Sequence, residues 1–232
     1  MASITYESLI PDIIPYVQGC PDVMIQNAIR STAIDFCERT GAFQQELDPV
    51  TTVSGIYEYD LEPPSGYIVQ KIMWVIHKGA DLEPITTALL EQRYRKWRDE
   101  TGTPSVYVKV SQALFHLVPI PDSNQTSSTI LRVQLKPTQT SVRCDSEVMN
   151  DYRDTIVNGA IFRLLRIPSR DWTDYAAAGV YNTLYLEGVN NAERRARGGD
   201  EAIAKRVSYG GIHTGRETRK YASRRIFRSG SY

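Results

Sequence analysis

The spacing of apolar residues changes twice along the chain, and this change constrains the fold most. Across residues 23–37, apolar side chains recur every three or four positions, which predicts an amphipathic helix that ends at Gly41. Across residues 47–135, short segments rich in β-branched and aromatic residues alternate with turn residues, which predicts strands. Across residues 147–197 the helical spacing returns. The pattern predicts an α+β fold in which strands interrupt a set of helices.

We therefore expect a helical bundle made of N-terminal and C-terminal helices, an inserted antiparallel β-rich domain, and an extended C-terminal tail. The predicted boundaries are 1–46 for the N-terminal helices of the bundle, 47–140 for the inserted β-rich domain, 141–198 for the C-terminal helices, and 199–232 for the basic extended tail.

The helical regions carry recognisable start and stop signals. Pro11 and Pro15 limit any helix before residue 17 to short pieces, because proline disrupts a helix interior. In the returning helical region, Asp145 or Ser146 can cap a helix over residues 147–166. A second helix is predicted to open near Asp171 and to continue to about residue 197.

The insert is predicted to contain several strands and one short helix. We expect a hairpin formed by residues 51–53 and 56–61, followed by a long strand over residues 67–77 that turns back toward residues 82–85. A helix lying on the sheet is predicted within residues 86–101. Further strands are predicted at residues 105–110, 113–118 and 129–135.

The charges are distributed unevenly, although the formal net charge of the 232 residues is zero. Residues 1–193 contain 16 Lys and Arg and 24 Asp and Glu, which gives this body a net charge of −8. Residues 194–232 contain 11 Lys and Arg and 3 Asp and Glu, a net charge of +8. Such an asymmetry is informative about partners and assembly, and we expect a chain built for docking.

Cysteine usage and hydropathy exclude several other classes of protein. Cys20, Cys37 and Cys144 are far apart and form no CxxC pair, so we expect neither a metal site nor a disulfide framework. The first residues have no basic segment followed by an apolar one, and no apolar run reaches the roughly 18 residues that span a membrane. We expect a protein made in a cytoplasm, with no cofactor and no membrane partner.

The candidates for catalysis are weak, and we predict that the protein is not an enzyme. His77, His116 and His213 lack the spacing of zinc ligands. The segment 210–215 resembles a phosphate-binding loop only loosely, since it lacks the terminal Lys and Ser or Thr and a following helix. The pairs Asp151/Asp154 and Asp171/Asp174 are explained better by helix capping or solvated helix faces than by acid–base chemistry.

The tail combines basic and aromatic residues, a pattern typical of segments that bind a nucleic acid or another protein. Three interpretations stay open. The tail can bind a nucleic acid through phosphate contacts and base stacking, it can bind a protein through arginine and aromatic contacts, or it can be an unstructured, solvated end. The residues to which we assign docking are Arg216, Arg219, Lys220, Tyr221, Arg224, Arg225, Ile226, Phe227, Arg228 and Tyr232.

The order of several short motifs resembles the head-to-tail adaptor proteins of tailed bacteriophages, the short-tailed type in particular. The motifs are the proline-punctuated segment 9–17, Ala28-Ile29-Arg30, Asp35-Phe36-Cys37, Tyr59-Asp60-Leu61-Glu62-Pro63-Pro64, Gly102-Thr103-Pro104-Ser105-Val106-Tyr107, Leu117-Val118-Pro119-Ile120-Pro121, Tyr152-Arg153-Asp154 and Leu164-Leu165-Arg166-Ile167-Pro168. The resemblance covers residues 5–195 and does not extend to the tail.

This resemblance implies a structural role in the neck of a virion assembled in the host cytoplasm. Twelve copies would form a ring under the portal protein, extend the DNA channel, and offer a platform for a downstream tail or nozzle protein and for tail fibres. DNA would pass through the channel without specific binding. By position alone, the tail would dock to the portal. The alternative is a nucleic-acid-binding accessory protein that grips DNA through its basic tail.

Overall fold

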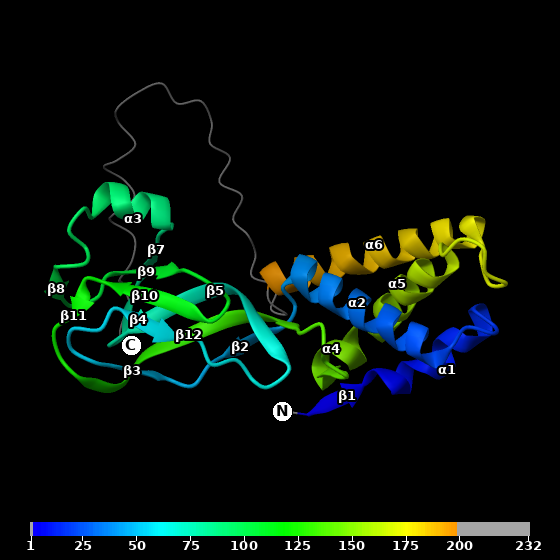
Figure 1. The fold of residues 1–232 in the computed structure, drawn as a ribbon, viewed down its shortest axis with the longest axis horizontal. Coiled ribbons are helices and arrows are strands. Elements are labelled where there is room, and N and C mark those ends of the chain that lie inside the picture. Colours follow the sequence, from blue (N-terminus) through cyan, green and yellow to red (C-terminus); the bar gives the residue numbers. More distant parts are fainter. Residues whose placement is uncertain (1, 199–232) are drawn as a thin grey trace, which may run out of the picture. The chain divides into compact units, whose positions relative to one another are not determined.

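The computed structural model describes residues 2–198, which belong to one compact unit spanning Met1–Asp200 (Figure 1). The predicted tail at 199–232 lies outside the described residues. The described residues contain both helices and sheets, so the mixed composition predicted from the sequence is confirmed.

Most of the helical residues lie before the first long strand and after the last one. The helices are α1 (Ile10–Ile13), α2 (Asp22–Thr40), α3 (Thr87–Arg93), α4 (Ser146–Asp151), α5 (Arg153–Leu165) and α6 (Tyr175–Gly198), with two 3₁₀ turns, η1 (Tyr6–Leu9) and η2 (Ile14–Tyr16). Helices α2, α5 and α6 pack against one another, and α1 lies against α2 and α5 (Figure 1). The helical segments around Pro11 and Pro15 are short, as the sequence predicts.

Helix α2 has the bounds that its sequence predicts. Gly41 adopts the left-handed conformation (φ 62°), and its N–H donates to the carbonyl of Cys37 at 3.1 Å, which closes the helix. Ile25, Ile29 and Phe36 are fully buried on one face of α2, so the apolar spacing read from the sequence marks the packed face.

The strands form two larger sheets and two short pairs. Their bounds are β1 (Ser3–Thr5), β2 (Gln44–Glu46), β3 (Val50–Thr52), β4 (Glu58–Asp60), β5 (Tyr67–His77), β6 (Ala80–Asp81), β7 (Glu83–Pro84), β8 (Thr101–Gly102), β9 (Val106–Lys109), β10 (Leu114–Val118), β11 (Ile120–Pro121), β12 (Gln125–Pro137) and β13 (Arg143–Asp145). The long strand β5 and the strands β9, β10 and β12 confirm the predicted ones.

The two larger sheets share one core. In the first sheet, β12 pairs with β5 in an antiparallel register that places Leu131 opposite Val75, and β2, β3 and β6 extend it. The second sheet has the order β4-β10-β9-β7. Leu131 and Val75 belong to the same buried cluster as Phe115 and Leu117 of β10. Helix α3 covers the other face of the second sheet, where Leu90 packs in a smaller cluster with strand residues.

The predicted hairpin of residues 51–61 is wrong. Strand β3 pairs with β12 and strand β4 pairs with β10, so the two segments belong to different sheets. Each strand is short and gains a partner distant in sequence, and local alternation cannot identify such a partner. Residues 83–84 also pair in parallel with β9, and β8 pairs in parallel with β11, so the expectation of a wholly antiparallel insert needs correction.

Two predicted helices are shorter than expected. The helix expected within residues 86–101 ends at Arg93, because the chain turns so that Trp97 is buried and its Nε1 donates to Glu91 Oε1 at 3.3 Å. The helix expected over 147–166 is divided into α4 and α5 at Tyr152, whose ring packs on Phe36 with centroids 4.9 Å apart. The predicted cap is confirmed, since Asp145 Oδ1 accepts from the Glu147 N–H at 2.9 Å.

Polar contacts join the helices to the first sheet. The side-chain amide of Gln134 on β12 donates to the carbonyl of Cys37 at 3.2 Å, and Lys136 forms an ion pair with Glu38 at 3.3 Å. The larger buried cluster also contains residues of α2, α5 and α6 as well as residues of both sheets. The helices and the sheets are therefore packed around one continuous core.

Candidate docking surfaces

The residues assigned to docking from the sequence, Arg216 to Tyr232, lie outside the described residues 2–198. The same holds for His213 and for the loop 210–215. The docking role of the tail therefore stays a prediction. The surfaces of the described residues have to be considered on their own contacts.

The titratable groups that the sequence singled out have structural partners. Burial lowers the pKa of His77, whose Nδ1 lies 2.9 Å from Thr129 Oγ1, and His116 Nε2 lies 3.1 Å from Glu58 Oε2. Asp174 caps α6, since its Oδ1 accepts from the N–H groups of Ala176 and Ala177 at 3.0 Å. The capping interpretation is thus confirmed for Asp174, while α6 begins four residues after the predicted start near Asp171.

Within residues 2–198, no group of three or more His, Cys, Asp and Glu side chains is arranged to hold a metal ion. The three cysteines are free thiols. A hydrogen bond with Cys144, together with burial, raises the pKa of the Cys37 thiol well above its usual value, so this thiol stays protonated and poor at binding metal. No helix in the described part is long and apolar enough to cross a membrane.

A polar junction fixes three helices relative to one another. Asp35 of α2 accepts a hydrogen bond from the Tyr185 hydroxyl of α6 at 2.6 Å and from Arg39 Nε at 3.1 Å. Arg163 of α5 lies 3.8 Å from the same carboxylate. Burial, followed by the hydrogen bond to Asp35, raises the pKa of Tyr185, so its hydroxyl remains a donor at neutral pH. The junction thereby holds α2, α5 and α6 in fixed positions relative to one another.

Glycine allows these helices to approach closely. A Cβ added to Gly159 of α5 would lie 2.5 Å from Cγ2 of Thr32 on α2 and 2.7 Å from Cδ2 of Tyr185 on α6. Such distances are far shorter than any ordinary contact, so a side chain at Gly159 would push the helices apart. The close packing makes the helical region a rigid support for the features on its surface.

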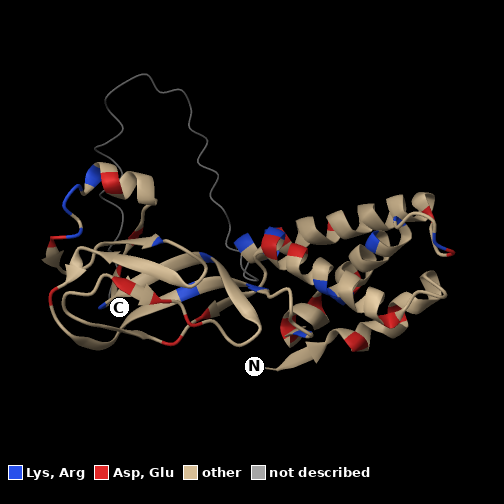
Figure 2. Ribbon diagram, in the orientation of Figure 1, with Lys and Arg blue, Asp and Glu red and all other residues tan. Residues whose placement is uncertain are grey.

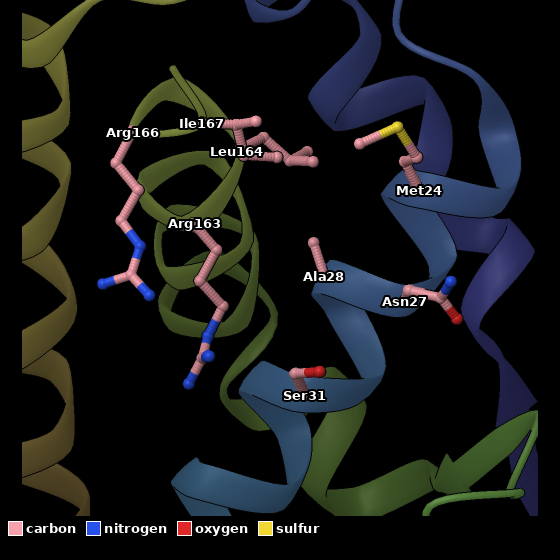
Figure 3. Close-up of a pocket in the computed structure, with 8 residues that line it drawn as sticks. All are labelled: Met24, Asn27, Ala28, Ser31, Arg163, Leu164, Arg166 and Ile167. Carbon is pink, nitrogen blue, oxygen red and sulfur yellow. The ribbon is translucent and has the colours of Figure 1, made fainter.

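A groove lies between α2 and α5, with a volume of about 270 Å³ (Figure 3). Met24 and Ala28 of α2 face Leu164 of α5 and Ile167, just after α5, across it, and the polar Asn27 and Ser31 border it on the α2 side. Its floor is therefore apolar and its α2 border uncharged. This groove, which we call the α2–α5 groove, has the composition of a peptide-binding or helix-binding surface.

Arginines line the α5 side of the α2–α5 groove. Figure 3 shows the side chains of Arg163 and Arg166 extending in the same direction from α5. The Arg166 guanidinium lies 5.1 Å from the ring centroid of Phe162, a contact that leaves its charge available for a partner. Arg163 lies 3.8 Å from the Asp35 carboxylate, and the Arg166 guanidinium lies on the side of α5 that faces α6 (Figure 3).

Another hollow, lined by both carboxylates and aromatic rings, lies on the opposite side of α5. Asp154, Val157 and Ile161 of α5 line it together with Asp12, Tyr16 and Tyr181. The rings of Tyr16 and Tyr181 pack edge to face with centroids 5.6 Å apart. Asp12 pairs with Arg153 at 2.7 Å, whereas Asp154 has no ion pair among the described residues.

Two exposed apolar residues lie on the turn η2, and one of them, Tyr16, lines that hollow. Ile14 is 44% exposed and Tyr16 is 51% exposed. Together with Asp12 and Asp154, which line the hollow, these residues form a surface that we call the η2 surface. Helix α6 continues it, because this helix carries no charged residue from Tyr175 to Leu186, and Figure 2 shows its charges gathered at the C-terminal end.

The sequence comparison identifies the family. Residues 4–206 match the family model of the SU10 adaptor protein, which spans nearly all described elements. The chain belongs to the SU10 adaptor protein family. The resemblance to phage head-to-tail adaptors is thereby confirmed, and the chain is a structural adaptor of a bacteriophage virion. No curated protein matches the chain.

In this SU10 adaptor, the α2–α5 groove and the η2 surface are candidate docking surfaces that sequence reasoning missed. Both are built from residues distant in the chain, so no local pattern marks them. One signal was present: Arg163 and Arg166 interrupt a helix whose other side carries Ile156, Ala160 and Leu164. Two arginines at i, i+3 on one face of an amphipathic helix indicate a charged stripe, but not the groove beside it.

Proposed function

We propose that this adaptor forms a ring of twelve copies beneath the portal, extends the DNA channel, and provides the platform for the tail. The observation that carries the proposal is the family match over residues 4–206. A ring requires two different surfaces on each copy that fit each other and close, and the described residues offer distinct surfaces on the two sides of α5. The partners in this proposal are the portal and a downstream tail or nozzle protein, with tail fibres beyond.

In this proposal, each segment predicted from the sequence has its own structural role. Residues 1–46 and 141–198 act as one helical bundle, residues 47–140 act as an inserted β-rich domain, and residues 199–232 act as the docking tail. The packing of α2 against α5 and α6 supports grouping the two helical segments. The particle type, short-tailed, and assembly in the host cytoplasm belong to the same proposal.

The charge distribution suits a DNA channel. Residues 1–193 carry a net charge of −8, so an inner wall built from them repels the phosphate backbone. DNA then slides past without being bound specifically. The basic and aromatic residues of the tail, from Arg216 to Tyr232, are proposed to contact the portal, with arginines binding its acidic groups and aromatic rings filling its pockets.

The proposal for the tail is tested by portal capture. The full chain and a variant truncated after Gly199 are incubated with purified portal rings, and bound adaptor is quantified after sedimentation. We expect the truncated chain to lose most of its binding. Undiminished binding by the truncated chain would show that the tail is not the portal-docking element.

A second candidate function is that of a nucleic-acid-binding accessory protein. The observation that favours it is the excess of 11 Lys and Arg over 3 Asp and Glu after Glu193, interleaved with aromatic residues. It predicts DNA binding that weakens steeply with salt and that disappears when Arg216, Arg219, Arg224 and Arg225 are changed to Ala. Loss of portal capture in the same variant, without any DNA binding by the wild-type chain, would favour the adaptor proposal.

A further inference from the structure

We propose that a basic turn of one adaptor copy docks into an acidic hollow of the next copy, and that this contact joins neighbours in the ring. The basic turn, at the end of α3 and in the segment after it, consists of Arg93, Arg95 and Lys96. The acidic hollow is lined by the carboxylates of Asp48, Asp60 and Glu62. The inference rests on the proposed ring, its occupant is a second copy of this chain, and it is argued from the opposite charge of the two surfaces.

The basic turn is an exception in an acidic body. Residues 1–193 carry a net charge of −8, yet four of their 16 Lys and Arg lie within the six residues 93–98. Figure 2 shows basic residues gathered at the end of α3 and in the segment after it. Arg93, Arg95 and Lys96 are exposed, and none of them forms an ion pair among residues 2–198. Their charge is therefore available to a partner.

Buried and paired neighbours hold the basic turn in place. Trp97 is buried, and its Nε1 donates to Glu91 Oε1 at 3.3 Å. Arg98 Nη2 donates to the same oxygen at 2.7 Å, which lowers the pKa of the Glu91 carboxyl, and the Arg98 guanidinium lies 4.3 Å from the centroid of the Trp97 ring. Glu91 thus neutralises Arg98 and leaves the other three cations free. A turn that is already ordered loses little conformational freedom when it docks.

The acidic hollow has the opposite charge and a volume of about 240 Å³. Its three acidic residues are exposed, and none of them forms an ion pair among residues 2–198. Leu47 and Leu61 also line it. A lysine or arginine that enters the hollow can therefore lay its apolar stem against the leucines and place its charged end at the carboxylates. The hollow suits a long basic side chain.

The two surfaces are separate on one copy. The acidic hollow lies between β3 of the first sheet and β4 of the second, since residues of both strands line it. The basic turn lies over the face of the second sheet that α3 covers, where Trp97 packs in the smaller buried cluster. A copy that offers its hollow to one neighbour and its turn to the other makes head-to-tail contacts, and such contacts generate a ring when the rotation between copies closes. Contacts of turn with turn or of hollow with hollow are disfavoured, because like charges would meet.

Two full-chain variants with exchanged charges test the contact. One carries Arg95→Glu and Lys96→Glu, so its turn and its hollow are both acidic. The other carries Asp60→Lys and Glu62→Lys, so both of its surfaces are basic. We expect each variant alone to lower the ring fraction about tenfold or more, measured by native mass spectrometry after incubation with portal rings. An equimolar mixture should recover most of it, because the acidic turn of one variant then meets the basic hollow of the other, and the basic turn meets the acidic hollow.

Recovery in the mixture also shows that both variants are folded, since an unfolded chain cannot complete a ring. The matched control reverses the charge of two exposed arginines away from both surfaces, through Arg143→Glu and Arg170→Glu. This control should leave the ring fraction unchanged.

A cross-link locates the contact independently of ring closure. A carbodiimide joins a lysine amine directly to a carboxylate in contact with it, with loss of water. In an equimolar mixture of isotope-labelled and unlabelled wild-type chains, we expect cross-linked peptides in which Lys96 of one copy is joined to Asp60 or Glu62 of another. The variant with Arg95→Glu and Lys96→Glu is the control, because it lacks the amine and should give no such peptide.

The outcomes distinguish the two proposals. Recovery in the mixture together with the Lys96 cross-link supports the contact. Wild-type rings without this cross-link, in which the charge changes have no effect or are not recovered in the mixture, overturn the contact while the proposed ring stands. The cross-link without any closed ring supports the contact and contradicts the proposed ring. The absence of both the cross-link and the ring overturns the two proposals together.

Discussion

The helices and the sheets of this adaptor are stabilised in different ways. Helices α2, α5 and α6 depend on a close approach at Gly159 and on a shared carboxylate at Asp35. The two sheets depend on interlocked apolar side chains such as Phe115 and Leu131, and α3 covers one outer face. The α2–α5 groove and the hollow beside η2 both lie on the helical region. The two regions share one apolar core, and the helical region adds to it a close helix approach and a polar junction.

The largest expected effect tests whether the two regions are separable. Phe36→Ala in α2 and Phe115→Ala in β10 each remove a fully buried ring, and each should lower the free energy of unfolding by about 3–5 kcal/mol. Because one core cluster contains both residues, urea unfolding should remain a single transition in both variants. Two transitions, of which each variant shifts only one, would show that the regions fold independently.

A smaller difference is expected between two tyrosine hydroxyls. Tyr185→Phe removes a hydrogen bond to the Asp35 carboxylate and should cost about 1.5–3 kcal/mol, as bonds to charged groups do. Tyr59→Phe removes a hydrogen bond to the Ile56 carbonyl at 2.8 Å and one from the Val53 N–H at 3.2 Å. Neither partner is charged, and the change should cost about 0.5–1.5 kcal/mol. Equal losses in urea unfolding would contradict the importance of the Asp35 junction.

The close helix approach predicts opposite effects for two glycines. Gly159→Ala should destabilise by about 1–2 kcal/mol, since overpacking outweighs the gain in helix propensity. Gly179→Ala in α6 has open space around its Cβ and should stabilise by about 0.5–1 kcal/mol. The midpoint of thermal unfolding measures both. A stabilising Gly159→Ala would show that the helices are less tightly packed than described.

The smallest expected effect concerns pH and the sheet region. Burial lowers the pKa of His77 in the folded chain, so the unfolded chain binds more protons near and below its usual pKa of about 6.5. The contribution of His77 to stability is complete above that pH and is lost as the pH falls through it toward the folded pKa. His77→Gln should reduce the loss of stability between about pH 7 and 5, and His116→Gln serves as the comparison. An unchanged pH profile in His77→Gln would refute this account.

The sequence predicted those elements whose signals are local. Helix α2 follows from the spacing of Ile25, Ile29 and Phe36 and from Gly41, and strand β5 follows from its β-branched and aromatic residues. The division at Tyr152 and the early end of the helix at Arg93 depend on where single aromatic rings are buried, which local spacing does not reveal.

The sheet topology and the candidate site could not be predicted in the same way. Strand β3 pairs with β12 and β4 pairs with β10. Which distant strands pair depends on how all the apolar side chains pack together in the core. The α2–α5 groove and the η2 surface are each built from residues that lie far apart in the described chain. The family, by contrast, was recognisable from the order of motifs over residues 5–195, because order along the chain is a property of the sequence itself.

The central claim is that this adaptor forms a ring at the neck of the virion, and a cryo-electron microscopy reconstruction of the native particle tests it most directly. We predict a ring of twelve copies directly beneath the portal, around the DNA channel, with each copy in contact with its two neighbours. A reconstruction that places the chain elsewhere in the particle, or that shows isolated copies without mutual contact, would contradict the account.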